Sequence, residues 1–215
     1  MSDSGKGSCC PGGSRTHGSF DESPGIKIDE QNDKMDFAII GDASTGKTSL
    51  ILRKVKNEFL EDTQPTVIDG VDIIYQDAQR KKTTFHLSDT GGQVDYRSVP
   101  VHYIKSSKGI ILVCSYDRPE SVENLKHWKE LIENNSNLKE KSLYVILNKS
   151  DLKKPESQLY DDVEKWAHDS NALFFETSAK SDPQSVNDAF DNIFESFLNP
   201  MKEDEEKKEN DEKKE

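Results

Sequence analysis

Apolar residues in the middle of the chain follow two periodicities that alternate along the sequence. Six short, mostly apolar runs have the length of strands: 35–41, 70–77, 83–88, 109–115, 143–148 and 172–176. Five further runs are predicted to be helical: 47–58, 95–105, 120–134, 156–170 and 183–198. In 120–134 and 183–198 the apolar residues recur at helical spacing. This alternation predicts an α/β fold with a mostly parallel, doubly wound sheet. The runs 70–77 and 83–88 are too close to flank a helix, so they predict an antiparallel hairpin at an edge of the sheet.

Both ends of the chain differ in composition from its middle. Residues 1–34 are rich in Gly, Ser, Pro and Asp, and residues 201–215 are almost entirely Lys, Glu, Asp and Asn. Over the whole chain 32% of the residues are hydrophobic and 33% are charged, which is a low apolar share for a compact domain. We therefore predict a disordered N-terminal tail over 1–34, one domain over 35–200 and a charged C-terminal tail over 201–215. The C-terminal tail could also be a frayed continuation of the last helix.

A phosphate-binding motif joins the first strand-like run to the first helical run. Residues 41–48 read Gly-Asp-Ala-Ser-Thr-Gly-Lys-Thr and fit the P-loop pattern G-x-x-x-x-G-K-[ST]. Gly41 and Gly46 would let backbone N–H groups approach phosphate oxygens, and the start of the helix adds further donors. Lys47 would reach the β- and γ-phosphates, and the Thr48 hydroxyl would coordinate Mg²⁺. An accidental match in a Gly/Ser-rich turn is the alternative, which the flanking strand and helix disfavour.

Another polar motif follows the strand-like run 83–88, at the edge where open α/β sheets bind their ligands. Its sequence is Asp89-Thr90-Gly91-Gly92-Gln93. An acidic side chain at a strand end can hold Mg²⁺, a Gly N–H can approach a γ-phosphate, and a Gln can orient an attacking water. Taken alone, the same residues could form only a turn.

Two more motifs concern a nucleotide base. They are Asn148-Lys149-Ser150-Asp151 and Glu176-Thr177-Ser178-Ala179-Lys180, each after a strand-like run. The Asp151 carboxylate can accept two N–H bonds from guanine, whereas adenine offers no such pair of donors. Small residues in the second motif would let a backbone N–H reach the guanine O6. Each motif could also be a polar turn, but the first one disfavours an ATP-using kinase or ATPase.

Together, these motifs resemble the nucleotide site of Ras-superfamily small GTPases, in the same order and at similar spacing over residues 35–200. The resemblance implies a P-loop NTPase small G domain: a six-stranded, mostly parallel sheet with one antiparallel edge strand and flanking helices. It also implies a GTP/GDP switch that uses Mg²⁺ and hydrolyses GTP. The residues it implies are the catalytic Gln93 and the metal ligands Thr48, Thr66 and Asp89. The nucleotide-binding residues it implies are Asp42, Ala43, Ser44, Thr45, Gly46, Lys47, Thr48, Ser49, Phe59, Thr66, Gly92, Asn148, Lys149, Asp151, Ser178, Ala179 and Lys180.

Two of these assignments come from the family pattern alone. The family has a Thr in its first switch loop that binds Mg²⁺ only in the GTP state. Thr63 and Thr66 are the candidates, and the family's spacing from Lys47 selects Thr66. Phe59 stands where the family often places an aromatic ring against guanine, and a hydrophobic contact that ends the first helical run is an equal alternative.

Within the superfamily, the sequence is most similar to Rab proteins. The segments that resemble the Rab second switch and the elements after it are 96–98, 102–103, 109–113 and 120–128. Residues 65–67 are instead closer to Ras and Rho members, and residues 70–72 lie two positions later than in the Rab first switch. We therefore expect a Rab-like regulator of vesicle or membrane traffic, with a Ras- or Rho-type signalling switch as the alternative.

Two residues depart from the family pattern in ways that bear on catalysis. Ala43 replaces the Gly of Ras proteins and the Ser of many Rab proteins. Its Cβ would point toward the γ-phosphate and an incoming arginine finger, so we predict slow intrinsic hydrolysis. Gly91 replaces the usual Ala and should make the second switch more flexible. A hydrolysis-impaired GTP-binding interaction module is thus an alternative function, against which Gln93 and Thr66 argue.

Charge and cysteine content bear on location and partners. The net charge of −12 disfavours binding to nucleic-acid backbones through charge alone. No apolar run approaches the roughly 20 residues that cross a bilayer, and Cys114 lies in an apolar run as an expected buried thiol. No disulfide framework or zinc spacing is visible. We expect a cytoplasmic monomer whose switch loops bind effectors and which meets an exchange factor and a GTPase-activating protein.

Attachment to a membrane would differ from that of most Ras, Rho and Rab proteins. The sequence ends at Glu215 without the cysteine that C-terminal prenylation requires, and Ser2 excludes N-myristoylation. Cys9 and Cys10 are the remaining candidates, for S-acylation; the alternative is a pair of free thiols in a tail. Peripheral association with endomembranes is therefore an open expectation.

Overall fold

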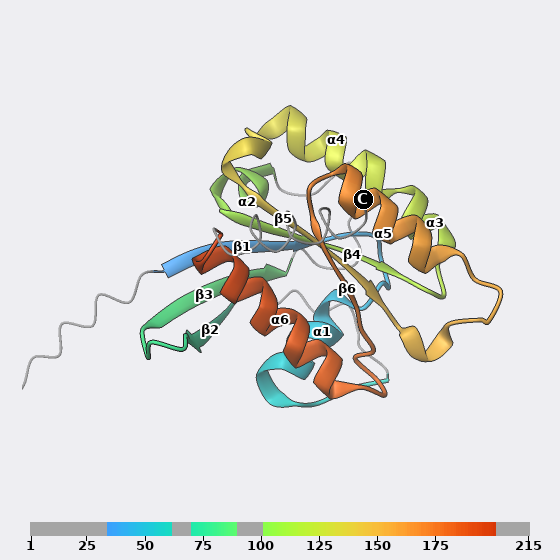
Figure 1. Ribbon diagram of the computed structural model, residues 1–215, viewed down its shortest axis with the longest axis horizontal. Coiled ribbons are helices and arrows are strands. Elements are labelled where there is room, and N and C mark those ends of the chain that lie inside the picture. Colours follow the sequence, from blue (N-terminus) through green and yellow to red (C-terminus); the bar gives the residue numbers. More distant parts are fainter. Residues whose placement is uncertain (1–33, 62–69, 90–100, 201–215) are drawn as a thin grey trace, which may run out of the picture. The chain divides into compact units, whose positions relative to one another are not determined.

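A six-stranded sheet forms the centre of the domain, in the order β2-β3-β1-β4-β5-β6 (Figure 1). The structure is a computed structural model that describes residues 34–61, 70–89 and 101–200. The strands are β1 (Lys34–Ile40), β2 (Val71–Gln76), β3 (Lys82–Asp89), β4 (Gly109–Ser115), β5 (Ser142–Asn148) and β6 (Leu173–Glu176). All neighbouring strands are parallel except β2, which runs antiparallel to β3 at the edge. The predicted fold class, its edge hairpin and the positions of all six strands are confirmed.

Six helices flank this sheet within the described residues. They are α1 (Lys47–Lys56), α2 (Val101–Ser106), α3 (Pro119–Glu123), α4 (Leu125–Asn135), α5 (Leu159–Asp169) and α6 (Pro183–Leu198). The single helix expected over 120–134 is wrong, because α3 and α4 are separate and meet at Asn124. The ψ of Asn124 is −10°, well away from the −42° of a regular α-helix. Residues 95–100 of the second helical run and both expected tails lie outside the described residues, so the domain boundaries stay predictions.

Successive residues of β1 point to opposite faces of the sheet and enter two different cores. Phe37 and Ile39 pack with apolar side chains of α1 and α6, whereas Ala38 and Ile40 pack with those of α2, α4 and α5. Figure 1 shows α1 and α6 together on one side of the sheet, with α2 and α4 on the other. Cys114 belongs to the second core, as a buried free thiol whose pKa is raised by burial.

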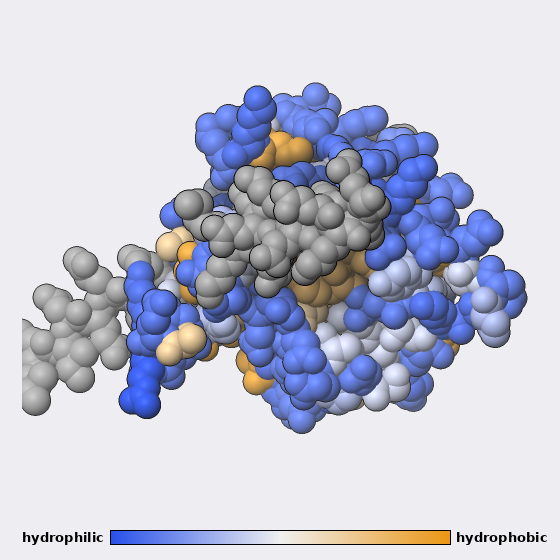
Figure 2. All heavy atoms as spheres, in the orientation of Figure 1, coloured by the Kyte–Doolittle hydropathy of each residue, from blue (hydrophilic) through white to orange (hydrophobic). Residues whose placement is uncertain are grey.

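Hydrophilic residues cover most of the face seen in Figure 2. The apolar residues of the periodic runs therefore lie mainly inside, as the amphipathic pattern predicts. None of the helices in the described segments is long and apolar enough to cross a membrane.

The register of the sheet brings the ends of the parallel strands together. Asp89 at the end of β3 lies beside Ile39 of β1, and Asn148 at the end of β5 lies beside Ser115 of β4. Glu176 at the end of β6 pairs with Leu147. The motifs that follow β1, β3, β5 and β6 thus start from one edge of the sheet.

Candidate functional site

The loop between β1 and α1 requires glycine at two positions. Gly41 and Gly46 have φ values of 142° and 96°, which residues with a Cβ rarely adopt. A Cβ on Gly41 would lie 2.2 Å from the carbonyl oxygen of Val113, and one on Gly46 would lie 2.3 Å from the amide nitrogen of Asn148. The loop therefore packs closely on β4 and on the end of β5, and these contacts fix its backbone conformation.

The ammonium group of Lys47 folds back over this loop. Its Nζ donates hydrogen bonds to the carbonyl oxygens of Gly41 (2.8 Å) and Asp42 (2.7 Å), and the residue is buried. Burial lowers the pKa of Lys47 from 10.5 to about 8, although the carboxylates of Asp89 and Asp42 partly oppose this. A positive charge held at the loop and poorly solvated is well suited to receive an anion such as a phosphate.

Thr48 and Asp89 place two oxygen ligands beside the loop. The Thr48 hydroxyl donates a 2.6 Å hydrogen bond to Oδ2 of Asp89, a buried carboxylate at the end of β3. Hydroxyl and carboxylate oxygens suit Mg²⁺, which takes octahedral coordination. Across 34–61, 70–89 and 101–200, no group of three or more His, Cys, Asp or Glu could hold a metal ion. A magnesium ion bound here would therefore need further ligands besides Thr48 and Asp89, such as phosphate oxygens, water and the predicted Thr66.

Asn148 connects three parts of the site through one buried side chain. Its Nδ2 donates to the carbonyl oxygen of Thr45 in the phosphate-binding loop (3.0 Å). Its Oδ1 accepts hydrogen bonds from the Thr177 hydroxyl (3.2 Å) and the Ala179 N–H (3.3 Å), both in the loop after β6. Asn148, which the sequence predicts at the guanine base, thus connects the phosphate-binding loop to the loop after β6.

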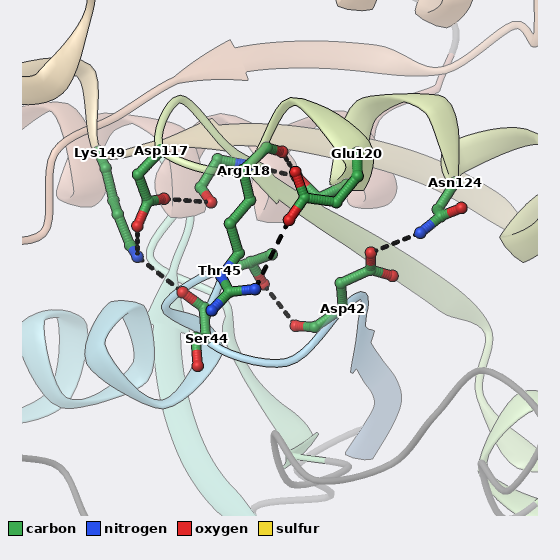
Figure 3. Close-up of polar contacts among 10 residues, drawn as sticks. Asp42, Ser44, Thr45, Asp117, Arg118, Glu120, Asn124 and Lys149 are labelled. Carbon is green, nitrogen blue, oxygen red and sulfur yellow. Dashed lines mark hydrogen bonds and ion pairs between the residues drawn. The ribbon is translucent and has the colours of Figure 1, made fainter.

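Lys149 makes a second connection to the phosphate-binding loop (Figure 3). Its Nζ donates to the carbonyl oxygen of Ser44 (2.6 Å) and pairs with Oδ2 of Asp117 (2.7 Å). Burial would raise the pKa of Asp117, but hydrogen bonds from Lys149 and Ser115 outweigh it and keep that pKa below its usual value. Asp117 belongs to none of the expected motifs, and no signal in the sequence marks it.

Asp151 and Ser178, from two different motifs, bind each other. The Ser178 hydroxyl donates to Oδ1 of Asp151 and its oxygen accepts from the Ser181 N–H (3.0 Å). Ser178 is buried, whereas Asp151 is exposed. Because a carboxylate has about four acceptor sites, Asp151 can still accept hydrogen bonds from a ligand in this position.

Arg53 ties α1 to the loop after β6. Its Nε donates to the carbonyl oxygen of Ala179 (2.8 Å), and Nη1 donates to the carbonyl oxygen of Asn57 (2.7 Å). Arg53 is absent from the expected site residues. Its position three residues after the buried Leu50 could have indicated the inward face of α1, but not its partner.

The remaining described residues of the expected site differ in burial and in their contacts. Ala43 is exposed, Ser49 near the start of α1 is half-buried, and Lys180 is exposed and pairs with Glu61 (3.0 Å). Phe59 packs, half-buried, against the core formed with α1 and α6. This contact agrees with the alternative interpretation of Phe59, and its role beside guanine stays a prediction.

Part of the expected site lies outside the described residues. This holds for both threonine candidates of the first switch and for the second switch, namely Thr63, Thr66, Gly91, Gly92 and Gln93. The assignments of Thr66 to Mg²⁺, Gly92 to the γ-phosphate and Gln93 to catalysis stay predictions.

Known proteins with similar sequences share most of this domain. The sequence model of the Ras family matches residues 36–199. The "Ras-related protein Rab-13" of Bos taurus is 31% identical over 162 residues, which are 74% of this chain and 78% of that protein. The protein of the same name from Mesocricetus auratus is 30% identical over 160 residues, with the same coverage. The "Ras and EF-hand domain-containing protein" of Danio rerio is 34% identical over 150 residues, 67% of this chain but 22% of that protein.

Proposed function

Because the chain belongs to the Ras family, we propose that it is a Rab-like small GTPase, a molecular switch that binds Mg-GTP and hydrolyses it to GDP and phosphate. The observation that carries this proposal is the buried side chain of Asn148, which joins the phosphate-binding loop to the loop after β6. Such a frame suits a ligand that has phosphates at one end and a base at the other. GTP and GDP have this form.

The phosphate end of the ligand would lie against the loop of Gly41, Gly46 and Lys47. Phosphate oxygens would accept hydrogen bonds from Lys47 and from N–H groups at the start of α1. A bound anion stabilises the charged form of Lys47, so the lowered pKa of this residue should rise again on binding. When bound, Mg²⁺ would supply positive charge beside the phosphates, and Thr48 and Asp89 are the residues that would hold it.

The base end would lie against Asp151, which the Ser178 hydroxyl holds in place. A carboxylate there accepts hydrogen bonds from N1–H and the exocyclic amine of guanine, and it would lose both with adenine. Arg53 and Asn148 both bind Ala179 and would keep the neighbouring backbone in position for the guanine O6.

Hydrolysis is the part of the proposal that depends on Gln93, which would orient the attacking water. Ala43 in the phosphate-binding loop is exposed and has a methyl group where Ras proteins have none. We therefore propose a slow intrinsic rate that a GTPase-activating protein would raise. The alternative function, a GTP-binding module impaired in hydrolysis, rests on the same residue.

Phosphate release in a single turnover, from purified protein loaded with GTP, tests the activity. The wild-type protein should release phosphate slowly, the Gln93→Leu variant more slowly still, and the Ala43→Gly variant faster. If wild-type protein retains GTP without releasing phosphate, the binding module is the correct function. If Gln93→Leu matches the wild type, the role assigned to Gln93 is wrong.

Effectors would recognise the switch loops that GTP orders through Thr66 and Gly92, and an exchange factor would promote release of GDP. The likeness to Rab-13 proteins supports a role in vesicle or membrane traffic. Residues 65–67, which are closer to Ras and Rho members, support a signalling switch as the second candidate. Labelling cells with an alkynyl palmitate, with a Cys9→Ser/Cys10→Ser variant as control, tests acylation as the means of membrane association.

A further inference from the structure

Asp42, the second residue of the phosphate-binding loop, directs its side chain away from the loop and toward α4 (Figure 3). Oδ2 of Asp42 accepts a 2.7 Å hydrogen bond from the amide of Asn124, and Oδ1 accepts a 2.8 Å hydrogen bond from the indole N–H of Trp128. Asn124 is the residue directly before α4, and Trp128 stands four residues later within that helix. Both carboxylate oxygens are thus held at the first turn of α4.

The backbone of Asp42, like its side chain, accepts two hydrogen bonds. Its carbonyl oxygen accepts hydrogen bonds from Nζ of Lys47 (2.7 Å) and from the hydroxyl of Thr45 (3.0 Å). One residue therefore connects the curve of the loop to α4. A negative charge this close to bound phosphates would by itself weaken their binding, so the contribution of Asp42 must be to fix the loop in position.

Trp128 extends this connection to another helix. Its ring is buried in the same apolar core as Ile104 of α2, and α2 and α4 are in contact. Helix α2 directly follows residues 90–100, the segment that contains Gly92 and Gln93. The bonds of Asp42 thus place the phosphate-binding loop, α4 and α2 in one continuous set of contacts.

We propose that Asp42 is a positioning residue, which slows nucleotide release by holding the phosphate-binding loop on Asn124 and Trp128 and makes Trp128 sense whether the loop is occupied. The proposal rests on the proposed function, since it requires a nucleotide in the loop. The side chain of Asp42 would act through the backbone of the loop, since its carboxylate binds Asn124 and Trp128.

Dissociation of a fluorescent N-methylanthraniloyl-GDP from the full chain tests the first half of the proposal. In Asp42→Asn the carboxylate is replaced by a neutral amide with one acceptor oxygen, so the two bonds to a charged group are lost, and a neutral bond to Asn124 can form only if the Asn124 amide turns over. In Trp128→Phe the aromatic ring stays but its donor is gone. Each variant should release the nucleotide about five- to tenfold faster, and the double variant should be faster than the wild type by less than the product of the two single effects. Additive effects, or release within twofold of the wild type, would overturn the proposal.

Trp166→Phe is the matched control, because Trp166 on α5 packs against the same core and has no part in the proposed contacts. Its release rate should equal that of the wild type. Circular dichroism checks folding, and if Asp42→Asn fails to fold, Trp128→Phe and Asn124→Ala decide the question. A wild-type protein that retains no labelled GDP would refute the proposed function itself, which is a different result from equal release by all variants.

Tryptophan emission tests the second half. The chain has two tryptophans, so Trp128 is the sole emitter in the Trp166→Phe protein. Removing GDP with EDTA should change its emission, and adding Asp42→Ala, which removes the acceptor of the Trp128 N–H, should abolish that change. Emission that does not respond to GDP, or that responds equally without the Asp42 carboxylate, would contradict the proposed sensing by Trp128.

Discussion

Burial and neighbouring charges have opposite effects on the pKa of Lys47. The pKa of Lys47 is about 8 in the folded protein against 10.5 for an ordinary lysine. Between these values the folded protein has released a proton that the unfolded chain still holds, so stability rises with pH. We expect the free energy of unfolding of the nucleotide-free protein to gain about 3 kcal/mol from Lys47 between pH 7 and pH 10.5. Urea unfolding at a series of pH values measures it.

Lys47→Met is the control for this experiment, because it removes the titrating group and keeps a long side chain. All other ionisable groups are the same in the two proteins, so the difference between their pH dependences isolates Lys47. The same pH dependence in both proteins would show that Lys47 has an ordinary pKa.

Asp151 should determine which base the site accepts. Xanthine has a carbonyl oxygen in place of the exocyclic amine of guanine, and an amide at position 151 can donate to that oxygen. We expect Asp151→Asn to weaken GDP binding about a hundredfold and to strengthen binding of xanthosine diphosphate. Competition against a fluorescent nucleotide measures both affinities. Asp162→Asn, an exposed carboxylate on α5, should change neither, and an Asp151→Asn protein that still prefers guanine would refute the assignment.

The motifs predicted a set of candidate site residues, but they did not predict the long-range contacts that hold these residues in place. Lys47, Thr48 and Asp151 stand out because their spacing and chemistry are recognisable locally. Arg53 contacts Ala179 across 126 positions of the chain, and Asp42 contacts Trp128 across 86. No local pattern encodes such pairs, because they arise only when the sheet places distant strand ends together.

At the scale of elements, the strands were predictable because buried parallel strands form nearly continuous apolar runs. β4 and β5 are almost wholly buried, and their predicted bounds differ from the observed ones by at most one residue. The separation of α3 from α4 could not be predicted, since the apolar stripe continues through Val122, Leu125 and Trp128. The break occurs at Asn124, whose side chain binds Asp42.

Arg53 connects helix α1 to the loop after β6, and we expect this connection to stabilise the domain. Arg53→Ala would remove the donors to Ala179 and Asn57 from a buried position. We expect a loss of about 2 kcal/mol in the free energy of unfolding and faster release of GDP. Denaturant unfolding and fluorescent-nucleotide release measure the two effects.

Lys56→Ala is the matched control, because Lys56 is exposed in the last turn of the same helix. It should change stability by less than about 0.5 kcal/mol. Unchanged stability and release in Arg53→Ala would show that α1 and the loop after β6 are held together by other contacts.

At the scale of the whole molecule, the alternation of strands and helices predicts the layered α/β architecture. Periodicity alone does not give the strand order, because several orders satisfy the same alternation. The resemblance to small GTPases implied six strands with one antiparallel strand at the edge, and the observed sheet agrees with both, whereas its strand order comes from the structure alone. One ligand should consequently bridge elements from both ends of the sequence.

Nucleotide binding should therefore stabilise the entire domain. With Mg-GDP at a thousand times its Kd, we expect the free energy of unfolding to rise by about 4 kcal/mol. EDTA should reverse most of this gain, since the metal held by Thr48 and Asp89 would also bind the phosphate oxygens. Thermal unfolding with GDP, with ADP and without nucleotide measures the effect, and equal stabilisation by ADP would contradict selection of guanine.

The central claim is that the site formed by the phosphate-binding loop and Asp151 holds a guanine nucleotide. The most direct test is to denature freshly purified protein and identify the released nucleotide by chromatography. The account predicts GDP or GTP in a nearly stoichiometric amount. Release of adenine nucleotides in its place would contradict it.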